Sequence, residues 1–482
     1  MIFTRTETDD DSVAARLTGL LGADMVLTGP DTAFYCRDWF GDVQGVTLAV
    51  LRPRDTGQVQ DCVRAAAALD LAIVPQGGNT GLVLGAMPDR PRQVVLSLER
   101  MTRIRSLDAD NFSAVVEAGV ILQDLKHTVA EQGLFFPLTL GAQGSCRIGG
   151  NVSTNAGGVN VLRYGMMREL VLGLEVVLPD GRVLNLLSGL RKDNRGIDLK
   201  QMFIGAEGTL GIVTAVAVKL MPAPDRVATA LIALPRLDDA ITVFRRARRD
   251  CCDLMSAFEF MPPLAFTLAR EARPDLALPM DATHPAYALI EISGSGLVDV
   301  DDLMQRFLEG VFADGLALDG VVAQSQAQAA ALWAVREGMN EGQARRGRHL
   351  RSDVSVPLSR LADFVTEVEA TVAVRLPVCT CVSYGHVGDG NVHLNVLPDQ
   401  GVGPEGVGDQ IAQAKLILHE VLDRFGGSIS AEHGIGRLKK ADFEARLPAL
   451  HRDMLTAIRD AVDPARIMNP GCQFDPLKEA RP

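Results

Sequence analysis

The chain has 482 residues, of which 47% are hydrophobic and 22% are charged. This length suggests about three units of roughly 150 residues, and the hydrophobic content excludes a disordered polymer. Forty-eight Lys and Arg against 60 Asp and Glu give a net charge of -12, which argues against a nucleic-acid or anionic-membrane surface. Glycine is over-represented, at 46 residues, and without a period of three it does not indicate collagen.

The N-terminal residues are acidic and polar and lack an apolar core. They predict neither a secretory signal nor an Arg-rich transit peptide. No uncharged apolar stretch reaches the roughly 18 residues that would cross a bilayer. We therefore expect a cytoplasmic protein without a membrane span.

In chain order, the first region alternates strand and helix patterns. Strands are predicted over residues 46–51, 72–75, 94–98, 114–117 and 172–178, and helices over 55–69 and 122–132. Asp55 is placed to cap the first of these helices. A boundary is predicted at Pro222-Ala223-Pro224.

The sequence after this boundary has few glycines until near Val378. Its first part predicts strands over 227–234 and 286–293 and helices over 237–248 and 299–309. Glycine and histidine then return together, followed by an amphipathic helix over 412–425.

Three loops of the first region concentrate glycine. The first, residues 75–81, follows a strand, and its consecutive glycines can point backbone N–H groups at an anion. The second, residues 144–158, holds five glycines and five Ser, Thr or Asn residues, and residues 205–212 repeat the style. So many points of close backbone approach predict one extended cofactor with a diphosphate.

The segments PQGGNTG, GSCRIGGNVSTNAGG and FIGAEGTLGIV resemble the FAD-binding domain of the vanillyl-alcohol oxidase and p-cresol methylhydroxylase (PCMH) superfamily. The resemblance covers nearly the whole chain. It is closest to the D-2-hydroxyglutarate dehydrogenase branch, which also holds D-lactate dehydrogenases and the flavin subunit of glycolate oxidase.

The resemblance implies an α+β fold in three parts. Residues 1–224 would form a PCMH-type FAD-binding domain of two subdomains. Residues 225–425 would form a substrate-binding cap with an antiparallel sheet, including a metal-ligand strand within 384–396. Residues 426–482 would return to the flavin and complete the active site.

In this family the first loop holds the FAD diphosphate, the second follows the ribityl chain and ring, and the third contacts the adenosine half. The first loop carries Asn79 and no His, which implies noncovalent FAD. The residues expected to bind FAD are Pro75, Gln76, Gly77, Gly78, Asn79, Thr80, Gly81, Gly144, Ser145, Ile148, Gly149, Gly150, Asn151, Thr154, Asn155, Gly157, Glu207, Gly208, Ile212 and Asn469. For Asn469, a turn before proline is the alternative.

Three of the eight histidines, His386, His393 and His433, lie in two short glycine-rich segments. Residues 391–396 predict a strand, so His393 and Asn395 should project to the same face. Two His and one carboxylate form a common metal-ligand set with open positions for water or substrate. The spacing is not an established metal motif, and hydrogen-bonding core histidines are the alternative.

The resemblance implies that His386, His393 and Glu432 bind a divalent ion: Zn²⁺ first, or Mn²⁺ or Fe²⁺. It implies that His433 contacts the substrate and acts as the base that takes its hydroxyl proton. Asp389, between two glycines, is expected to shape a turn instead.

A local positive patch holds five arginines between Arg336 and Arg351. The resemblance implies that these two hold the distal carboxylate of the substrate, with Asn340 and Asn395 as further substrate contacts. A guanidinium binds carboxylate or phosphate in two places. The family usually has Lys at position 351 and Thr at 340, so D-malate, D-lactate and 4-phosphoerythronate stay open as substrates.

These features together predict an FAD- and divalent-metal-dependent dehydrogenase. It would oxidise a D-2-hydroxy acid with a second anionic group by hydride transfer to flavin N5. An electron-transfer flavoprotein or a quinone is the expected acceptor, and a homodimer stays open. Alternatives from other classes are a metallohydrolase built on the same His, His and Glu set, and a non-catalytic electron-relay flavoprotein subunit.

Overall fold

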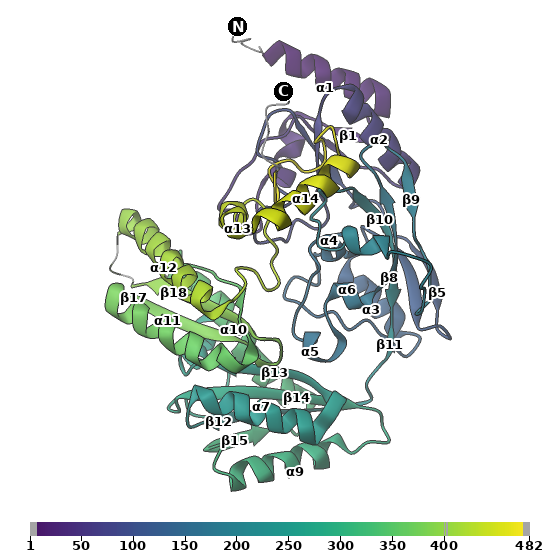
Figure 1. The fold of residues 1–482 in the computed structure, drawn as a ribbon. Coiled ribbons are helices and arrows are strands. Elements are labelled where there is room, and N and C mark those ends of the chain that lie inside the picture. The colour runs from purple at the N-terminus through teal and green to yellow at the C-terminus, as the bar shows by residue number, and fades with distance from the viewer. Residues whose placement is uncertain (1–6, 400, 402, 476–482) are drawn as a thin grey trace. The chain divides into compact units, whose positions relative to one another are not determined.

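The computed structural model describes residues 7–399, 401 and 403–475. The chain divides into two compact units (Figure 1). Unit 1 takes in residues 1–158, 165–223 and 432–482, and unit 2 takes in residues 159–164 and 224–431. Mixed helices and sheets confirm the predicted α+β class. Every described helix is too short or too polar to cross a membrane.

Unit 1 begins with α1 (Glu7–Leu21) and a four-stranded sheet in the order β1-β2-β4-β3. Its strands are β1 (Val26–Leu27), β2 (Ala49–Leu51), β3 (Ala72–Gln76) and β4 (Gln93–Ser97). Helix α2 (Thr56–Ala68) connects β2 to β3, and the Asp55 carboxylate caps it by accepting from the Gln58 backbone N–H at 2.9 Å, as predicted.

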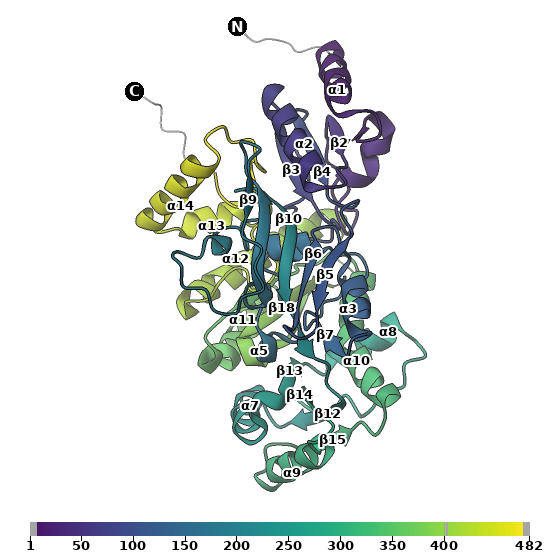
Figure 2. The ribbon, with the colours of Figure 1, turned by 90° about the vertical axis from the view of Figure 1, so that its right-hand side faces the viewer.

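A five-stranded antiparallel sheet forms the second part of unit 1, in the order β5-β6-β10-β8-β9 (Figure 2). Its strands are β5 (Ile104–Asp108), β6 (Ser113–Glu117), β8 (Val171–Val177), β9 (Val183–Asn185) and β10 (Ile212–Lys219). Between β6 and β8 the chain forms α3 (Leu122–Ala130), α4 (Ile148–Ser153) and α6 (Met167–Leu170). The C-terminal part of the unit adds α13 (Lys440–Arg446) and α14 (Ala449–Val462).

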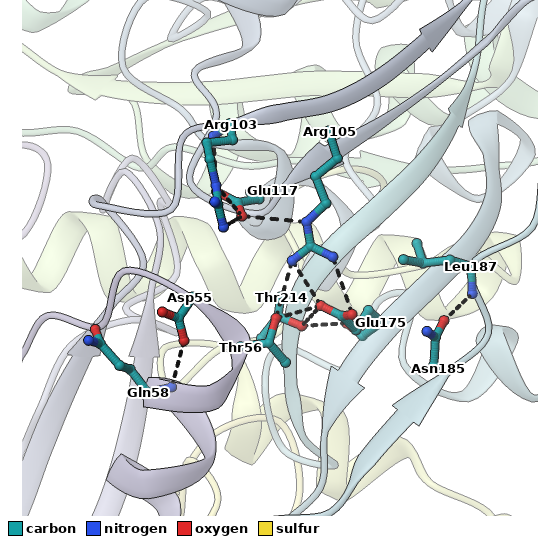
Figure 3. Close-up of polar contacts among 10 residues, drawn as sticks. All are labelled: Asp55, Thr56, Gln58, Arg103, Arg105, Glu117, Glu175, Asn185, Leu187 and Thr214. Carbon is teal, nitrogen blue, oxygen red and sulfur yellow. Dashed lines mark hydrogen bonds and ion pairs between the residues drawn. The ribbon is translucent and has the colours of Figure 1, made fainter.

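A buried ion network joins this sheet to α2 (Figure 3). Arg105 lies between two buried glutamates, with Nε 3.4 Å from Glu117 Oε1 and Nη2 3.1 Å from Glu175 Oε1. Thr56 at the start of α2 and Thr214 on β10 donate to Glu175 Oε1 at 2.6 and 2.8 Å. Because each buried carboxylate is paired, the network fixes α2 against the sheet without an isolated charge.

Unit 2 is built on a seven-stranded sheet in the order β15-β12-β14-β13-β17-β18-β16, and its strand pairs are antiparallel. The strands are β12 (Arg226–Leu234), β13 (Met255–Met261), β14 (Ala286–Gly294), β15 (Asp319–Val322), β16 (Val354–Ser355), β17 (Cys379–His386) and β18 (Asn391–Pro398). Strands β12, β14 and β18 confirm the predicted strands.

Alternation along β13 decides which side chains meet which helices. Phe258 packs against Phe244 of α7 (Leu237–Cys251), with ring centroids 5.4 Å apart. Its neighbour Glu259 faces the other way, toward α10 (Gln326–Arg346). Helix α9 (Val300–Ala313) packs beside α7, and α8 (Leu264–Ala272) packs beside α10.

Two more helices, α11 (Leu361–Arg375) and α12 (Pro404–Phe425), pack on β17 and β18. Ser383 of β17 donates to Glu369 of α11 at 2.7 Å. Because Ser383 alternates with Tyr384, the Tyr384 side chain faces α10. The α10 face of β13, β17 and β18 therefore carries the polar residues of unit 2 described below.

Candidate functional site

A cavity in unit 1 is lined by the three glycine loops and by His433. Its volume is about 850 Å³, including the solvent at its mouth. The predicted FAD residues that line it are Pro75, Gln76, Gly77, Gly78, Asn79, Thr80, Gly81, Gly149, Gly150, Asn151, Thr154, Glu207, Gly208 and Ile212.

Other predicted FAD residues lie outside the cavity lining: Gly144, Ser145, Ile148, Asn155, Gly157 and Asn469. The lining adds residues that the sequence reasoning missed: Val83, Gly85, Ala86, Leu98, Cys146, Arg147, Ser153, Gly211 and Val213. Several of these residues lie within the three glycine loops, so their place in the loops was a signal available in the sequence. Leu98 and Val213 are apolar residues at strand ends and carry no signal of their own.

The glycines of the loops serve two different purposes. A Cβ on Gly78 would lie 2.1 Å from the carbonyl oxygen of Ser145, so this glycine lets the first two loops touch. A Cβ on Gly149 would lie 2.6 Å from the Cβ of Ala118. A Cβ on Gly150, by contrast, would meet no protein atom within 4 Å, and this residue lines the cavity. Gly150 therefore offers open backbone to a ligand.

The carboxylate of Glu207 holds the segment that follows His433. Its Oε1 accepts from the Ile435 N–H and its Oε2 from the Gly436 N–H, both at 2.8 Å. The Gln473 amide donates to Oε1 at 3.1 Å. Burial raises the pKa of Glu207, against the lowering effect of these hydrogen bonds. Glu207 therefore lines the cavity and also anchors the His433 loop.

Asn469 bonds to two residues that line the same cavity. Its Nδ2 donates to the carbonyl oxygens of Gly85 at 2.9 Å and Glu207 at 2.7 Å, and its Oδ1 accepts from Arg437 at 2.9 Å. Its φ of 41° is left-handed, as in a turn. The side-chain amide is thus used by groups of the chain itself.

A second polar cluster lies on the α10 face of the unit 2 sheet. Strand register pairs Glu259 of β13 with His386 of β17. The rings of His386 and His393 have centroids 5.8 Å apart. His393 and Asn395 share this face, as predicted, and the Asn395 amide donates to Gln343 of α10 at 2.8 Å.

Glu259 is fully buried and carries two partners. Its Oε2 accepts from Arg336 Nε at 2.8 Å, and its Oε1 accepts from His386 Nδ1 in a short hydrogen bond. Burial raises the pKa of Glu259, but the charges of His386 and Arg336 and their hydrogen bonds reverse this and hold the pKa at about 2. Sequence reasoning missed Glu259, although a charged residue between Phe258 and Phe260 in a buried strand is a visible signal.

The predicted substrate residues of unit 2 lie on α10, on β18 and near β16. The Arg336 guanidinium lies over the Tyr384 ring, 4.6 Å from its centroid. The Tyr384 hydroxyl donates to Asn340 Oδ1 at 2.5 Å and accepts from Asn395 Nδ2 at 3.3 Å. Asn395 Oδ1 accepts from a backbone N–H. Arg351 is exposed.

Asp389 shapes the turn between β17 and β18, as predicted. Its Oδ1 accepts from the Asn391 N–H at 3.1 Å, and Gly390 has a left-handed φ of 77°. The turn sets the register of the two strands that carry His386 and His393.

The segment that leads into Glu432 runs along the edge of the same sheet. Ser355 of β16 pairs with Ser428 on the side away from β18. The Ala431 N–H donates to the Asp353 carbonyl oxygen at 3.4 Å. Glu432 is the next residue of the chain, and unit 1 resumes there.

Comparison with known proteins matches both parts of the chain. Residues 47–187 match the family described as "FAD binding domain", and residues 223–472 match "FAD linked oxidases, C-terminal domain". The chain is 41% identical to "D-2-hydroxyglutarate dehydrogenase, mitochondrial" of Bos taurus, over 90% of this chain and 78% of that protein. It is 38% identical to D-2-hydroxyglutarate dehydrogenase of Xanthomonas citri pv. viticola, over 92% and 93%.

Solved structures show the same fold. The chain superposes on p-cresol methylhydroxylase with substrate bound at a TM-score of 0.75, with 19% identity over 98% of both chains. For 4-ethylphenol oxidase from Gulosibacter chungangensis the TM-score is 0.73, with 18% identity over 98% of both chains. These likenesses confirm the PCMH-type fold, and the family match supports FAD as the cofactor. The chain therefore belongs to the D-2-hydroxyglutarate dehydrogenase family of FAD-linked oxidoreductases.

Proposed function

We propose that the protein oxidises a D-2-hydroxy acid with a second anionic group, of the 2-hydroxyglutarate class, to the 2-oxo acid, and that it needs FAD and a divalent metal ion. The observation that carries the proposal is the position of His433 in the wall of the glycine-loop cavity. An imidazole suits a base at neutral pH. The names of the curated relatives support the same substrate class.

The cavity fits a flat, diphosphate-containing cofactor. Gly81 and Gly150 line it, and a Cβ on either would meet no protein atom within 4 Å, so a ligand can approach the backbone there. Asn79 stands in the first loop without a neighbouring His, which supports noncovalent FAD. When bound, FAD supplies the acceptor for the hydride that leaves C2 of the substrate.

We assign His386, His393 and Glu432 as metal ligands. Two imidazoles and one carboxylate suit Zn²⁺, and also Mn²⁺ or Fe²⁺. His386 fits this role because its Nδ1 is bonded to the Glu259 carboxylate, and a carboxylate behind the ring is common for histidines that bind metals through the other nitrogen. When bound, the ion supplies a Lewis acid that lowers the pKa of the substrate hydroxyl.

The remaining steps belong to side chains of this protein. His433 takes the hydroxyl proton, and Glu207 keeps the His433 loop in place. Arg336 and Arg351 hold the distal anion, with Asn340 and Asn395 beside them. Within the described residues, Arg336 Nη1 and Nη2 donate no hydrogen bond to protein, so both are open to a carboxylate.

The decisive experiment is anaerobic mixing of the purified holoprotein with single 2-hydroxy acids, followed by the loss of flavin absorbance. D-2-hydroxyglutarate should bleach the flavin fastest, ahead of D-malate, 4-phosphoerythronate and D-lactate. Removing the metal by chelation should stop bleaching without releasing FAD. His433→Ala should do the same, with the exposed His451→Ala of α14 as the matched histidine control.

Other results would favour the rival functions. A purified protein without flavin absorbance would favour a metallohydrolase. Substrate-driven bleaching that persists in His433→Ala would favour an electron-relay subunit. The electron-transfer flavoprotein or quinone acceptor, the cytoplasmic location and the homodimer stay predictions.

A further inference from the structure

Glu259 is neither one of the proposed metal ligands nor one of the proposed substrate residues. It lies in the middle of β13, and its two carboxylate oxygens have different partners. One oxygen accepts from His386, a proposed metal ligand, and the other accepts from Arg336, a proposed substrate anchor. A single buried side chain therefore touches both functional groups of unit 2.

The sheet fixes this carboxylate in place. Glu259 pairs with Leu289 of β14 on one side and with His386 of β17 on the other. Phe258 and Phe260, its neighbours along the strand, are buried and alternate to the opposite face. On this central strand, with both oxygens bonded to side chains, the Glu259 carboxylate is out of contact with solvent.

The bond to Glu259 also decides which nitrogen of His386 can meet an ion. An ionised carboxylate only accepts hydrogen bonds, so Nδ1 must carry the hydrogen. A histidine that binds a metal is neutral, so a ring with its hydrogen on Nδ1 uses the lone pair of Nε2. A carboxylate behind a ligand histidine fixes the ring orientation and raises its basicity.

The second bond orients Arg336. Arg336 bonds Glu259 through Nε, and its Cζ lies 4.6 Å from the centroid of the Tyr384 ring, so the guanidinium is held without using its terminal Nη1–Nη2 edge. A guanidinium held through Nε keeps its paired Nη donors for a bidentate anion.

We propose that Glu259 is a positioning residue that presents Nε2 of His386 to the metal ion and directs Arg336 toward the distal anion of the substrate. The inference rests on the proposed function, because it assumes that His386 binds a metal. It adds a residue that contacts both His386, a proposed metal ligand, and Arg336, which is proposed to bind the second anionic group of the substrate.

The test compares two variants in which Arg336, the cation of the buried ion pair, is replaced. Arg336→Met keeps Glu259 and its bond to His386, whereas the double variant Glu259→Leu/Arg336→Met replaces both charges with apolar groups. Replacing both partners avoids an unpaired buried charge, which favours folding. Zn²⁺ affinity is measured by chelator competition on FAD-loaded protein, so the readout does not depend on turnover.

We expect the double variant to bind Zn²⁺ about 10–100-fold more weakly than Arg336→Met. In ¹⁵N-histidine-labelled protein without metal, NMR should show a hydrogen-bonded Nδ1–H of His386 in Arg336→Met, and this signal should be lost in the double variant. Glu291→Gln is the control, since Glu291 is a partly buried glutamate on β14 that accepts from Ser256 and Trp333 and not from a histidine. It should leave Zn²⁺ affinity unchanged.

The outcomes separate this inference from the proposed function. Equal Zn²⁺ affinity in Arg336→Met and the double variant would overturn the positioning role while leaving the metal site intact. If His386→Ala binds Zn²⁺ as tightly as the wild type does, the proposed metal site is wrong, and the positioning role of Glu259 is wrong with it. A loss of Zn²⁺ affinity in Glu291→Gln as large as in the double variant would overturn the specific role of Glu259, because Glu291 accepts from Ser256 and Trp333 and not from His386.

Discussion

Each unit holds a buried glutamate that contacts a histidine of the proposed active site or the segment that follows it, and the two glutamates are in opposite electrostatic settings. Glu207 in unit 1 is 7% exposed and Glu259 in unit 2 is 0% exposed. Glu207 accepts from backbone and amide N–H groups, and burial raises its pKa. Burial also acts on Glu259, but His386 and Arg336 bring its pKa down to about 2. The partners of a buried carboxylate, and not burial alone, therefore decide the direction in which its pKa shifts.

The largest effect predicted from this contrast is on stability. Glu259→Gln leaves Arg336 as a buried cation without its counter-charge, which should cost about 3–5 kcal/mol of unfolding free energy. Urea denaturation of the FAD-saturated protein measures it. Glu291→Gln, whose partners are the neutral Ser256 and Trp333, should cost less. If the two variants lose the same free energy, the charge of the Arg336 partner is not what stabilises Glu259.

Glu207→Gln should have a smaller effect on stability and a specific effect on the His433 loop. The new amide would turn an N–H toward the Ile435 or Gly436 N–H, and one unsatisfied donor costs about 1–3 kcal/mol. We expect slower flavin reduction with FAD still bound, measured by anaerobic stopped flow. Unchanged reduction with the same loss of stability would show that Glu207 supports the fold without positioning His433.

The sequence predicted the local features of these two regions and missed the distant ones. The Asp55 cap, the glycine loops and the Asp389 turn depend on residues a few positions apart. His386 is 127 positions from Glu259, and Ile435 is 228 positions from Glu207. These partners meet only because β13 lies beside β17 and because the C-terminal segment folds back into unit 1, and no local periodicity encodes either event.

Two neighbouring glycines of α4 test whether the loop glycines serve packing or ligand. Gly149→Ala would push its Cβ against Ala118 and should cost about 1–3 kcal/mol of stability in the apoprotein. Gly150→Ala meets no protein atom within 4 Å, so it should leave apoprotein stability unchanged and weaken FAD binding. Fluorescence titration of apoprotein with FAD separates the two. Equal FAD affinity in Gly150→Ala and wild type would remove this residue from the cofactor wall.

The smallest predicted effect on stability is at Glu175 in unit 1. This buried carboxylate has a third kind of environment, because its partners are one arginine and two threonines. Burial raises its pKa, but the hydrogen bonds from Arg105, Thr56 and Thr214 outweigh it, so the folded-state pKa lies below its ordinary 4.5. A lowered folded-state pKa stabilises the protein above the unfolded-state pKa, and the benefit is lost as pH falls through the folded-state pKa.

Glu175→Gln should therefore lower the unfolding free energy by about 1 kcal/mol at pH 7, and the difference from wild type should shrink as the pH falls below 4.5. Urea denaturation at a series of pH values measures the difference, and the exposed Glu131→Gln is the surface control. A difference that stays constant with pH would mean that the amide replaces the carboxylate's hydrogen bonds and that charge contributes nothing. In that case, the charge of the carboxylate would contribute to stability at Glu259, where both partners are cationic groups. It would not contribute at Glu175, whose partners are one arginine and two neutral hydroxyls.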